Sequence, residues 1–138
     1  MNILCNLTFS AQNVNSLNIS TNCPKQTKKI KAITNLDTDI IMLSDIRLGT
    51  NGSVINDVEK CFLYAGSNNY KFIYNSSKNS RGVGFLYKSK LNLEILHELK
   101  TICENMYALH VLINNTPVNL TVSRYTDQTV TIIIMNFS

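Results

Sequence analysis

The chain has 138 residues, of which 44% are hydrophobic and 16% are charged. This composition excludes a disordered chain, and the length favours one globular domain covering residues 1–138. The formal net charge of +4 is compatible with a polyanionic partner but does not require one.

Cysteine and histidine spacing excludes the common zinc sites. The four cysteines contain no C-x-x-C pair and the two histidines lie in no zinc spacing, so we expect free thiols in a reducing compartment. Asn6, Thr8 and Ser10 interrupt the apolar start of the chain, which argues against a signal peptide. No apolar run approaches the length of a membrane span. We expect an intracellular protein of the nucleus or cytoplasm, with no membrane association and no obligate protein partner.

The first third of the chain has the pattern of a strand, a helix and a second strand. Apolar residues alternate with more polar ones from Ile3 to Ala11, which predicts a strand. Pro24 suits the first turn of a helix that ends near Leu36. The run 40–43 is apolar at every position, as in a strand buried on both faces. This β-α-β start predicts an α/β fold.

The remaining chain is predicted to be mostly strands. The tripeptide Asn51-Gly52-Ser53 marks a turn. A short helix is expected at 54–62 and strands at 70–74, 82–87, 91–99 and 130–137. The clearest hairpin joins strands 106–113 and 118–124 through a connection at 114–117, in which Pro117 sits at a strand start.

Three polar residues follow or end predicted strands, where ligands gather in α/β folds. Asn13 follows the first strand, Asp45 follows the buried strand and Tyr125 ends the hairpin. Each alone is a weak signal, since a lone Asp after a strand is more often a turn or helix-capping residue. The combination indicates a candidate site.

Four segments in chain order resemble the motifs of one family. Residues 9–18 (FSAQNVNSLN) resemble a strand ending in N-x-N-G-L-N, and residues 39–48 (DIIMLSDIRL) resemble D-I-x-x-L-Q-E-T-R-L. Residues 80–86 (SRGVGFL) resemble a G-V-A/G strand, and residues 118–125 (VNLTVSRY) are similar to a strand ending in N-x-Y. The ordered set resembles the endonuclease/exonuclease/phosphatase superfamily. It is most similar to the apurinic-type endonucleases of non-LTR (LINE-type) retrotransposons, which accompany a reverse transcriptase.

The resemblance implies a fold, a cofactor and several site residues. The fold would be a partial α/β sandwich, with a β-sheet core and flanking helices. Asp45 stands where the family has a metal-binding Glu, and a carboxylate suits Mg²⁺. Asn13 stands at an Asn that helps to hold the metal and the reacting phosphate. Tyr125 stands at the catalytic Tyr that approaches the scissile phosphate of DNA.

Basic residues supply candidate nucleic-acid contacts. Arg47 matches the Arg of the second motif, and either a nucleic-acid contact or a salt bridge within its loop fits that position. Lys28 and Lys29 belong to a lysine cluster at 25–31. This cluster is either a solvated helix face or a phosphate-contacting patch.

The motifs that complete the family's active site find no match in this sequence. They are a G-D-x-N motif, a further Asp and a final Asp-His pair, and residues 132–138 resemble only the strand that leads into the first of them. His97 and His110 precede Tyr125 and cannot replace the final His by sequence order. Loss of a general acid or base costs roughly 10²–10⁴-fold in rate. We therefore expect a truncated domain that is inactive or weakly active.

Three other interpretations stay open. The chain could be a non-catalytic nucleic-acid-binding module, or a relative that hydrolyses small phosphoesters. It could also be an unrelated Asn-rich secreted domain, whose mark would be disulfides among the cysteines.

Overall fold

The structure is a computed structural model that describes residues 7–18, 23–63, 69–78, 80–125 and 128–135, with the backbone alone described at 23–25, 125 and 128–135. The described residues form two four-stranded sheets and two α-helices. Among the described residues, no helix is long and apolar enough to cross a membrane.

The first sheet, sheet A, has the strand order β1-β2-β4-β3. Its strands are β1 (Phe9–Asn13), β2 (Ile40–Ser44), β3 (Tyr70–Asn75) and β4 (Val83–Lys88). β1 and β2 are parallel, whereas the other neighbours are antiparallel. A parallel pair needs a crossover connection, and helix α1 (Cys23–Thr34) lies in it. The predicted β-α-β start is confirmed.

The second sheet, sheet B, is an antiparallel meander in the order β5-β6-β7-β8. Its strands are β5 (Leu93–Lys100), β6 (Met106–Ile113), β7 (Thr116–Tyr125) and β8 (Gln128–Met135). A short 3-10 helix, η2 (Ser89–Leu91), leads from sheet A into β5. It occupies the start of the segment 91–99 that was predicted as strand.

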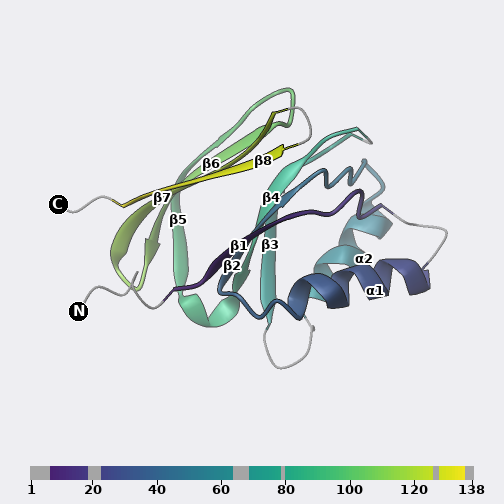
Figure 1. Ribbon diagram of the computed structural model, residues 1–138, viewed down its shortest axis with the longest axis horizontal. Helices are drawn as coiled ribbons and strands as arrows, with labels where there is room; N and C mark the ends of the chain where they lie inside the picture. The colour runs from purple at the N-terminus through teal and green to yellow at the C-terminus, as the bar shows by residue number, and fades with distance from the viewer. Residues whose placement is uncertain (1–6, 19–22, 64–68, 79, 126–127, 136–138) are drawn as a thin grey trace.

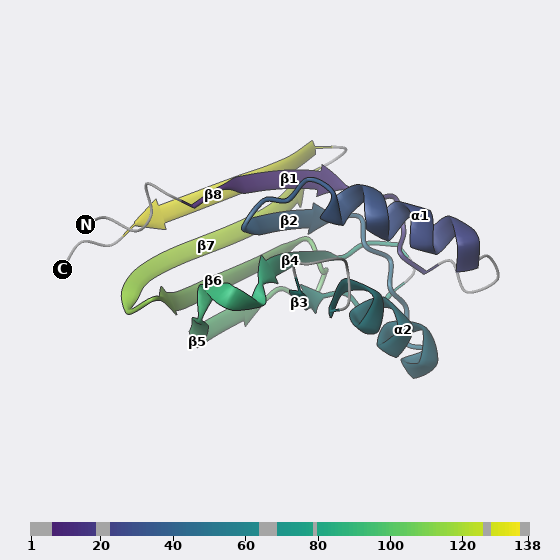
Figure 2. The same cartoon turned by 90° about the horizontal axis from the view of Figure 1, so that it is seen from below.

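The two sheets pack face to face, and the helices cover sheet A only. α1 and α2 (Gly52–Leu63) lie on the face of sheet A that points away from sheet B (Figures 1 and 2). Two apolar clusters result, one between the sheets and one between sheet A and the helices. All five residues of β2 are buried because this strand has a packed layer on each side. The continuous apolar run at 40–43 predicted this position.

The hairpin between β6 and β7 is tighter than predicted. Ile113 pairs with Thr116, so the turn is the dipeptide Asn114-Asn115, and Pro117 pairs with Leu112 inside the strand. Both asparagines have positive φ, at 48° and 67°. A two-residue turn of this kind needs left-handed backbone, which Asn tolerates.

The predicted turn at Asn51-Gly52-Ser53 is the start of a helix. Helix α2 begins at Gly52, and the Asn51 Oδ1 accepts the N–H groups of Ser53 at 3.0 Å and Val54 at 3.4 Å. Asn is a strong helix-capping residue for this reason. Of the first predicted strand, residues 9–11 belong to β1 and residues 7 and 8 do not, whereas residues 3–6 lie outside the described part.

Candidate functional site

The ends of β1 and β2 continue side by side beyond the strands. Val14 N–H donates to Ser44 O at 3.0 Å, Ser16 N–H to Asp45 O at 2.8 Å and Leu17 N–H to Ile46 O at 2.8 Å. The loop after β1 therefore follows the loop after β2. This pairing brings Asn13 and Asp45 to the same edge of sheet A, as expected for the carboxyl ends of parallel strands.

The segment 45–47 is also attached to the loop that precedes β4. Ile46 N–H donates to Gly82 O at 3.1 Å and Arg47 N–H donates to Arg81 O at 2.8 Å. Asp45 and Arg47 have positive φ, at 59° and 48°. Left-handed backbone at non-glycine residues is costly and clusters at functional sites. Hydrogen bonds on both sides hold this strained segment in place.

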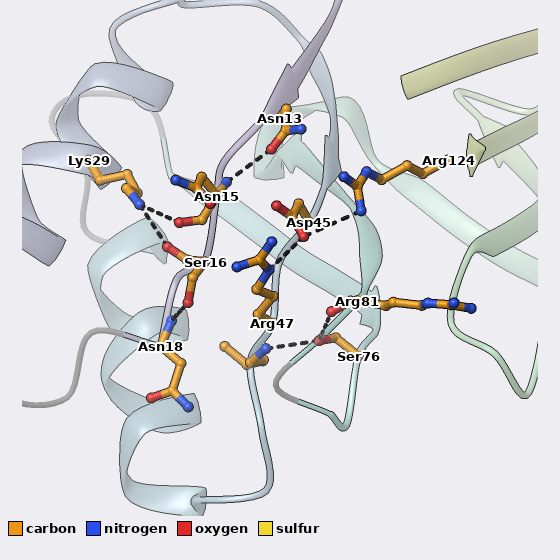
Figure 3. Close-up of polar contacts among 11 residues, drawn as sticks. Asn13, Asn15, Ser16, Asn18, Lys29, Asp45, Arg47, Ser76, Arg81 and Arg124 are labelled. Atoms are coloured by element: carbon orange, nitrogen blue, oxygen red, sulfur yellow. Dashed lines mark hydrogen bonds and ion pairs between the residues drawn. The ribbon is translucent and has the colours of Figure 1, made fainter. Parts of the chain in front are cut away.

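The Asp45 carboxylate is buried and bonded to two arginines. Its side chain is 4% exposed, and its Oδ1 accepts from Arg47 Nε at 2.7 Å. Arg124 Nη1 lies 3.5 Å from the same oxygen, and the two guanidinium groups approach from different sides (Figure 3). A buried carboxylate is costly without such partners. The salt bridge within the loop, one of the two interpretations of Arg47, is present.

Arg124 comes from sheet B, and sequence reasoning missed it. Val118, Leu120 and Val122 of β7 are fully or almost fully buried in the core between the sheets. Residues two apart in a strand share one face, so Arg124 also points inward. A charged residue at an inward position near a strand end was the available signal. Its partner, 79 positions earlier in the chain, could not be identified without the packing of the two sheets.

Asn13 lies at the edge of this site, and Lys29 supports the loop beside it. Asn13 is exposed, and its Oδ1 accepts from Asn15 N–H at 3.1 Å. Lys29 Nζ donates to the carbonyl oxygens of Asn15 and Ser16, both at 2.9 Å. Ser16 Oγ in turn accepts from Asn18 N–H at 3.2 Å (Figure 3). These bonds fix the loop after β1, so Lys29 has a structural task here.

The two remaining candidate residues are Lys28 and Tyr125. Lys28 is exposed on α1. Tyr125 is the last residue of β7, directly after Arg124, so its backbone lies beside the site. Its side chain is outside the described part of the chain.

A second loop, described at residues 76–78 and 80–82, lies beside the site and leads into β4. Ser76 Oγ accepts from Leu48 N–H at 3.0 Å and lies 3.5 Å from Arg81 O. Gly82 has φ of +128°, and a Cβ there would lie 2.4 Å from Ser76 Oγ. The glycine of the third motif is therefore required by both its backbone conformation and this close approach.

The contacts of Asp45 only partly suit the Mg²⁺ ion that the resemblance implies. A divalent cation needs free oxygen ligands; Asp45 Oδ1 is bonded to Arg47 and has Arg124 nearby, so among the described residues the arginines engage only one of the two carboxylate oxygens. Two guanidinium charges next to the carboxylate also repel a cation. Within the described ranges, no three His, Cys, Asp or Glu side chains come together as metal ligands. The described side chains around Asp45 form an ion-pair site.

Shifted pKa values occur away from this edge. Burial, with Asp37 and Asp39 nearby, raises the pKa of Tyr70 to about 12. Burial and a hydrogen bond to Glu98 raise the pKa of Tyr107. Raised phenol pKa values keep both groups neutral at neutral pH, which fits structural residues better than proton-transfer groups.

Comparison with known proteins bears on the fold. Neither a protein-family model nor a curated protein sequence matches the chain significantly. Solved structures do match. A humanized D. rerio TDP2 carrying 14 mutations aligns with a TM-score of 0.56 and 14% identity, covering 83% of this chain and 45% of that one. TDP2 from Caenorhabditis elegans aligns with a TM-score of 0.53 and 14% identity, covering 88% of this chain and 36% of that one.

The chain thus spans less than half the length of either TDP2 structure. At 14% identity the likeness concerns the fold. The fold is α/β, with two packed sheets and helices outside one of them, and it corresponds to part of an endonuclease/exonuclease/phosphatase-type sandwich.

Proposed function

We propose that these residues form part of a phosphodiester-cleaving nuclease domain, that they contact DNA phosphates at the edge that carries Asp45, and that alone they cleave DNA weakly or not at all. The observation that carries the proposal is the convergence of four motif segments. The ends of β1, β2 and β7 and the loop before β4 meet around one buried carboxylate. The residues of the four motif segments support a retrotransposon-type endonuclease as the related kind of protein.

Weak or absent cleavage is proposed from two features. The sequence has no match for the G-D-x-N motif or the final Asp-His pair, so water activation and leaving-group protonation have no assigned residues. In addition, Asp45 Oδ1 is engaged by Arg47, with Arg124 nearby. The two guanidinium charges weaken the attraction of the carboxylate for Mg²⁺.

The test is nicking of supercoiled plasmid with Mg²⁺ and with a chelator, comparing the wild-type chain with Asp45→Ala. We expect no Mg²⁺-dependent nicking above that of the variant. Lys60→Gln, which removes an exposed charge on α2, is the matched control. Circular dichroism of each sample shows that it is folded. Robust Mg²⁺-dependent nicking that disappears in Asp45→Ala would show that the chain is a working nuclease.

A non-catalytic nucleic-acid-binding domain is the second candidate, and the Asp45 ion-pair site favours it. The site holds one carboxylate and two guanidinium groups, Arg47 and Arg124. Phosphate contacts by arginine make affinity fall steeply with salt. This candidate predicts that the chain binds duplex DNA in a chelator and that the binding weakens as salt rises from about 50 to 200 mM. A chain without affinity for nucleic acid would show no such binding.

A further inference from the structure

We infer that Arg47 and Arg124 form a metal-independent clamp for a phosphate group, with Asp45 as the positioning residue that holds the arginines. This inference rests on the proposed contact with nucleic-acid phosphate and specifies its chemistry. The guanidinium groups supply the positive charge that a divalent cation would otherwise bring to Asp45.

The first argument is the donor capacity that remains on Arg47. Its Nε donates to Asp45, and among the described residues its side chain makes no other hydrogen bond or ion pair. A guanidinium has further N–H donors on its terminal nitrogens. The Arg47 side chain is 37% exposed, so these donors face solvent. Paired guanidinium donors match the oxygen spacing of a phosphate.

The second argument is the rigidity of the arrangement. Asp45 is buried and fixed by the backbone bonds on each side of it. Arg47 is two residues away on the same strained segment, and Arg124 reaches the carboxylate from sheet B (Figure 3). The arginines are therefore held before a ligand arrives, which reduces the entropy lost on binding.

The third argument is charge. Asp45 carries one negative charge between two positive ones, so the trio has a net positive charge. Arg81 is exposed in the adjoining loop. Another buried carboxylate, Glu104, accepts the N–H groups of Ser77 and Lys78 and is occupied within its own loop. The net positive charge of these side chains favours binding of an anion over binding of a cation.

The ligand class is a phosphate oxyanion on a nucleic-acid strand, either a terminal phosphate or an internal phosphodiester. The probes are fluorescent single-stranded oligothymidines with and without a 5′-phosphate, titrated by anisotropy at low salt in a chelator. Equal affinity for both assigns the clamp to internal phosphodiesters, whereas tighter binding of the phosphorylated strand assigns it to a terminal phosphate. We expect Arg47→Gln and Arg124→Gln each to weaken binding at least about tenfold, the loss typical of one charge-assisted contact.

Two further variants show whether a loss of binding is specific to the two arginines. Lys60→Gln removes the same charge from an exposed helix position and is expected to change affinity less than about twofold, because a distant exposed charge is screened by salt. Asp45→Asn keeps an oxygen that can accept from Arg47 but removes the negative charge. Binding in chelator should be retained or become tighter in Asp45→Asn. Arg47→Lys and Arg124→Lys replace the Gln variants if those fail to fold, and loss of the planar fork should still weaken binding.

Two results would overturn the inference: binding that appears only with added Mg²⁺, or binding in chelator that neither arginine affects. Neither result would change the outcome that we expect in the plasmid-nicking test. Conversely, Mg²⁺-dependent nicking would contradict weak cleavage without removing arginine-dependent binding in chelator, so the two proposals fail separately.

Discussion

The outer faces of the two sheets differ sharply. On sheet A, α1 and α2 cover the outer face, and β2 and β4 are buried at every position. On sheet B, no described helix covers the outer face. β6 alternates between buried and half-buried residues, and most of β5 is exposed. Antiparallel sheets can keep one face in water, whereas a strand covered on both faces must be apolar throughout. Stability should therefore depend far more on the outer face of sheet A.

The largest effect should come from the buried face between sheet A and the helices. Ile41 is fully buried in the cluster beneath α1 and α2, whereas Leu99 on β5 is 58% exposed. We expect Ile41→Ala to lower the free energy of unfolding by about 2–5 kcal/mol, because it removes buried methyl groups and leaves a cavity. Leu99→Ala should cost less than about 0.5 kcal/mol. Urea unfolding of both variants measures the difference.

A loss at Leu99 as large as that at Ile41 would break the comparison. It would mean that another surface covers β5 in solution. Repeating the unfolding at several protein concentrations would then test for a second copy of the chain, since association makes apparent stability concentration-dependent.

The next effect concerns the loop that brings β4 to the site edge. Gly82→Ala places a Cβ 2.4 Å from Ser76 Oγ at a φ of +128°. We expect a cost of roughly 1–3 kcal/mol for the strained backbone, together with loss of the Ser76 bond to Leu48. Gly52→Ala is the matched control, because a Cβ there meets nothing within 4 Å. The control should be neutral or slightly stabilising in thermal unfolding.

Equal melting temperatures for Gly82→Ala and Gly52→Ala would show that the loop 76–82 relaxes freely. The site edge would then be less rigid than the clamp requires, and the oligonucleotide affinity of Gly82→Ala would be the quantity to measure next.

The sequence predicted most of sheet A for a simple physical reason. Local periodicity reports how many faces of an element are buried. β2 and α1 follow that rule closely, as do the strands of the β6–β7 hairpin in sheet B. Asn51 was predicted as part of a turn because the tripeptide N-G-S suits both a turn and the start of a helix. The bonds from Val54 N–H to the Asn51 side chain and from Ile55 N–H to the Asn51 carbonyl oxygen identify a helix start.

The candidate site was predictable only in part. Asn13 and Asp45 could be paired because parallel strands end at the same edge. Arg124 could not be paired with Asp45, because their contact depends on how sheet B packs on sheet A. The salt bridge from Arg47 was one of two interpretations of the local sequence, whereas the second arginine at Asp45 depends on the packing of the two sheets. Long-range packing therefore supplies the contact that the local pattern could not show.

The smallest predicted effect tests how α2 is fixed on sheet A. Asn51 Oδ1 accepts from Ser53 and Val54 at the first turn of the helix, so Asn51→Ala should destabilise the protein by about 1 kcal/mol. Asn56→Ala removes the same side chain from an exposed position inside α2, where Ala is the better helix former, and should stabilise by a few tenths of a kcal/mol.

Urea unfolding followed by circular dichroism measures both asparagine variants. Opposite signs would establish that the capping bond, and not the loss of an asparagine, carries the effect. A stabilising Asn51→Ala would instead mean that the packing of Val54, Val58 and Phe62 holds the helix in place without its cap. The helix α2 would then be held on sheet A by apolar burial alone.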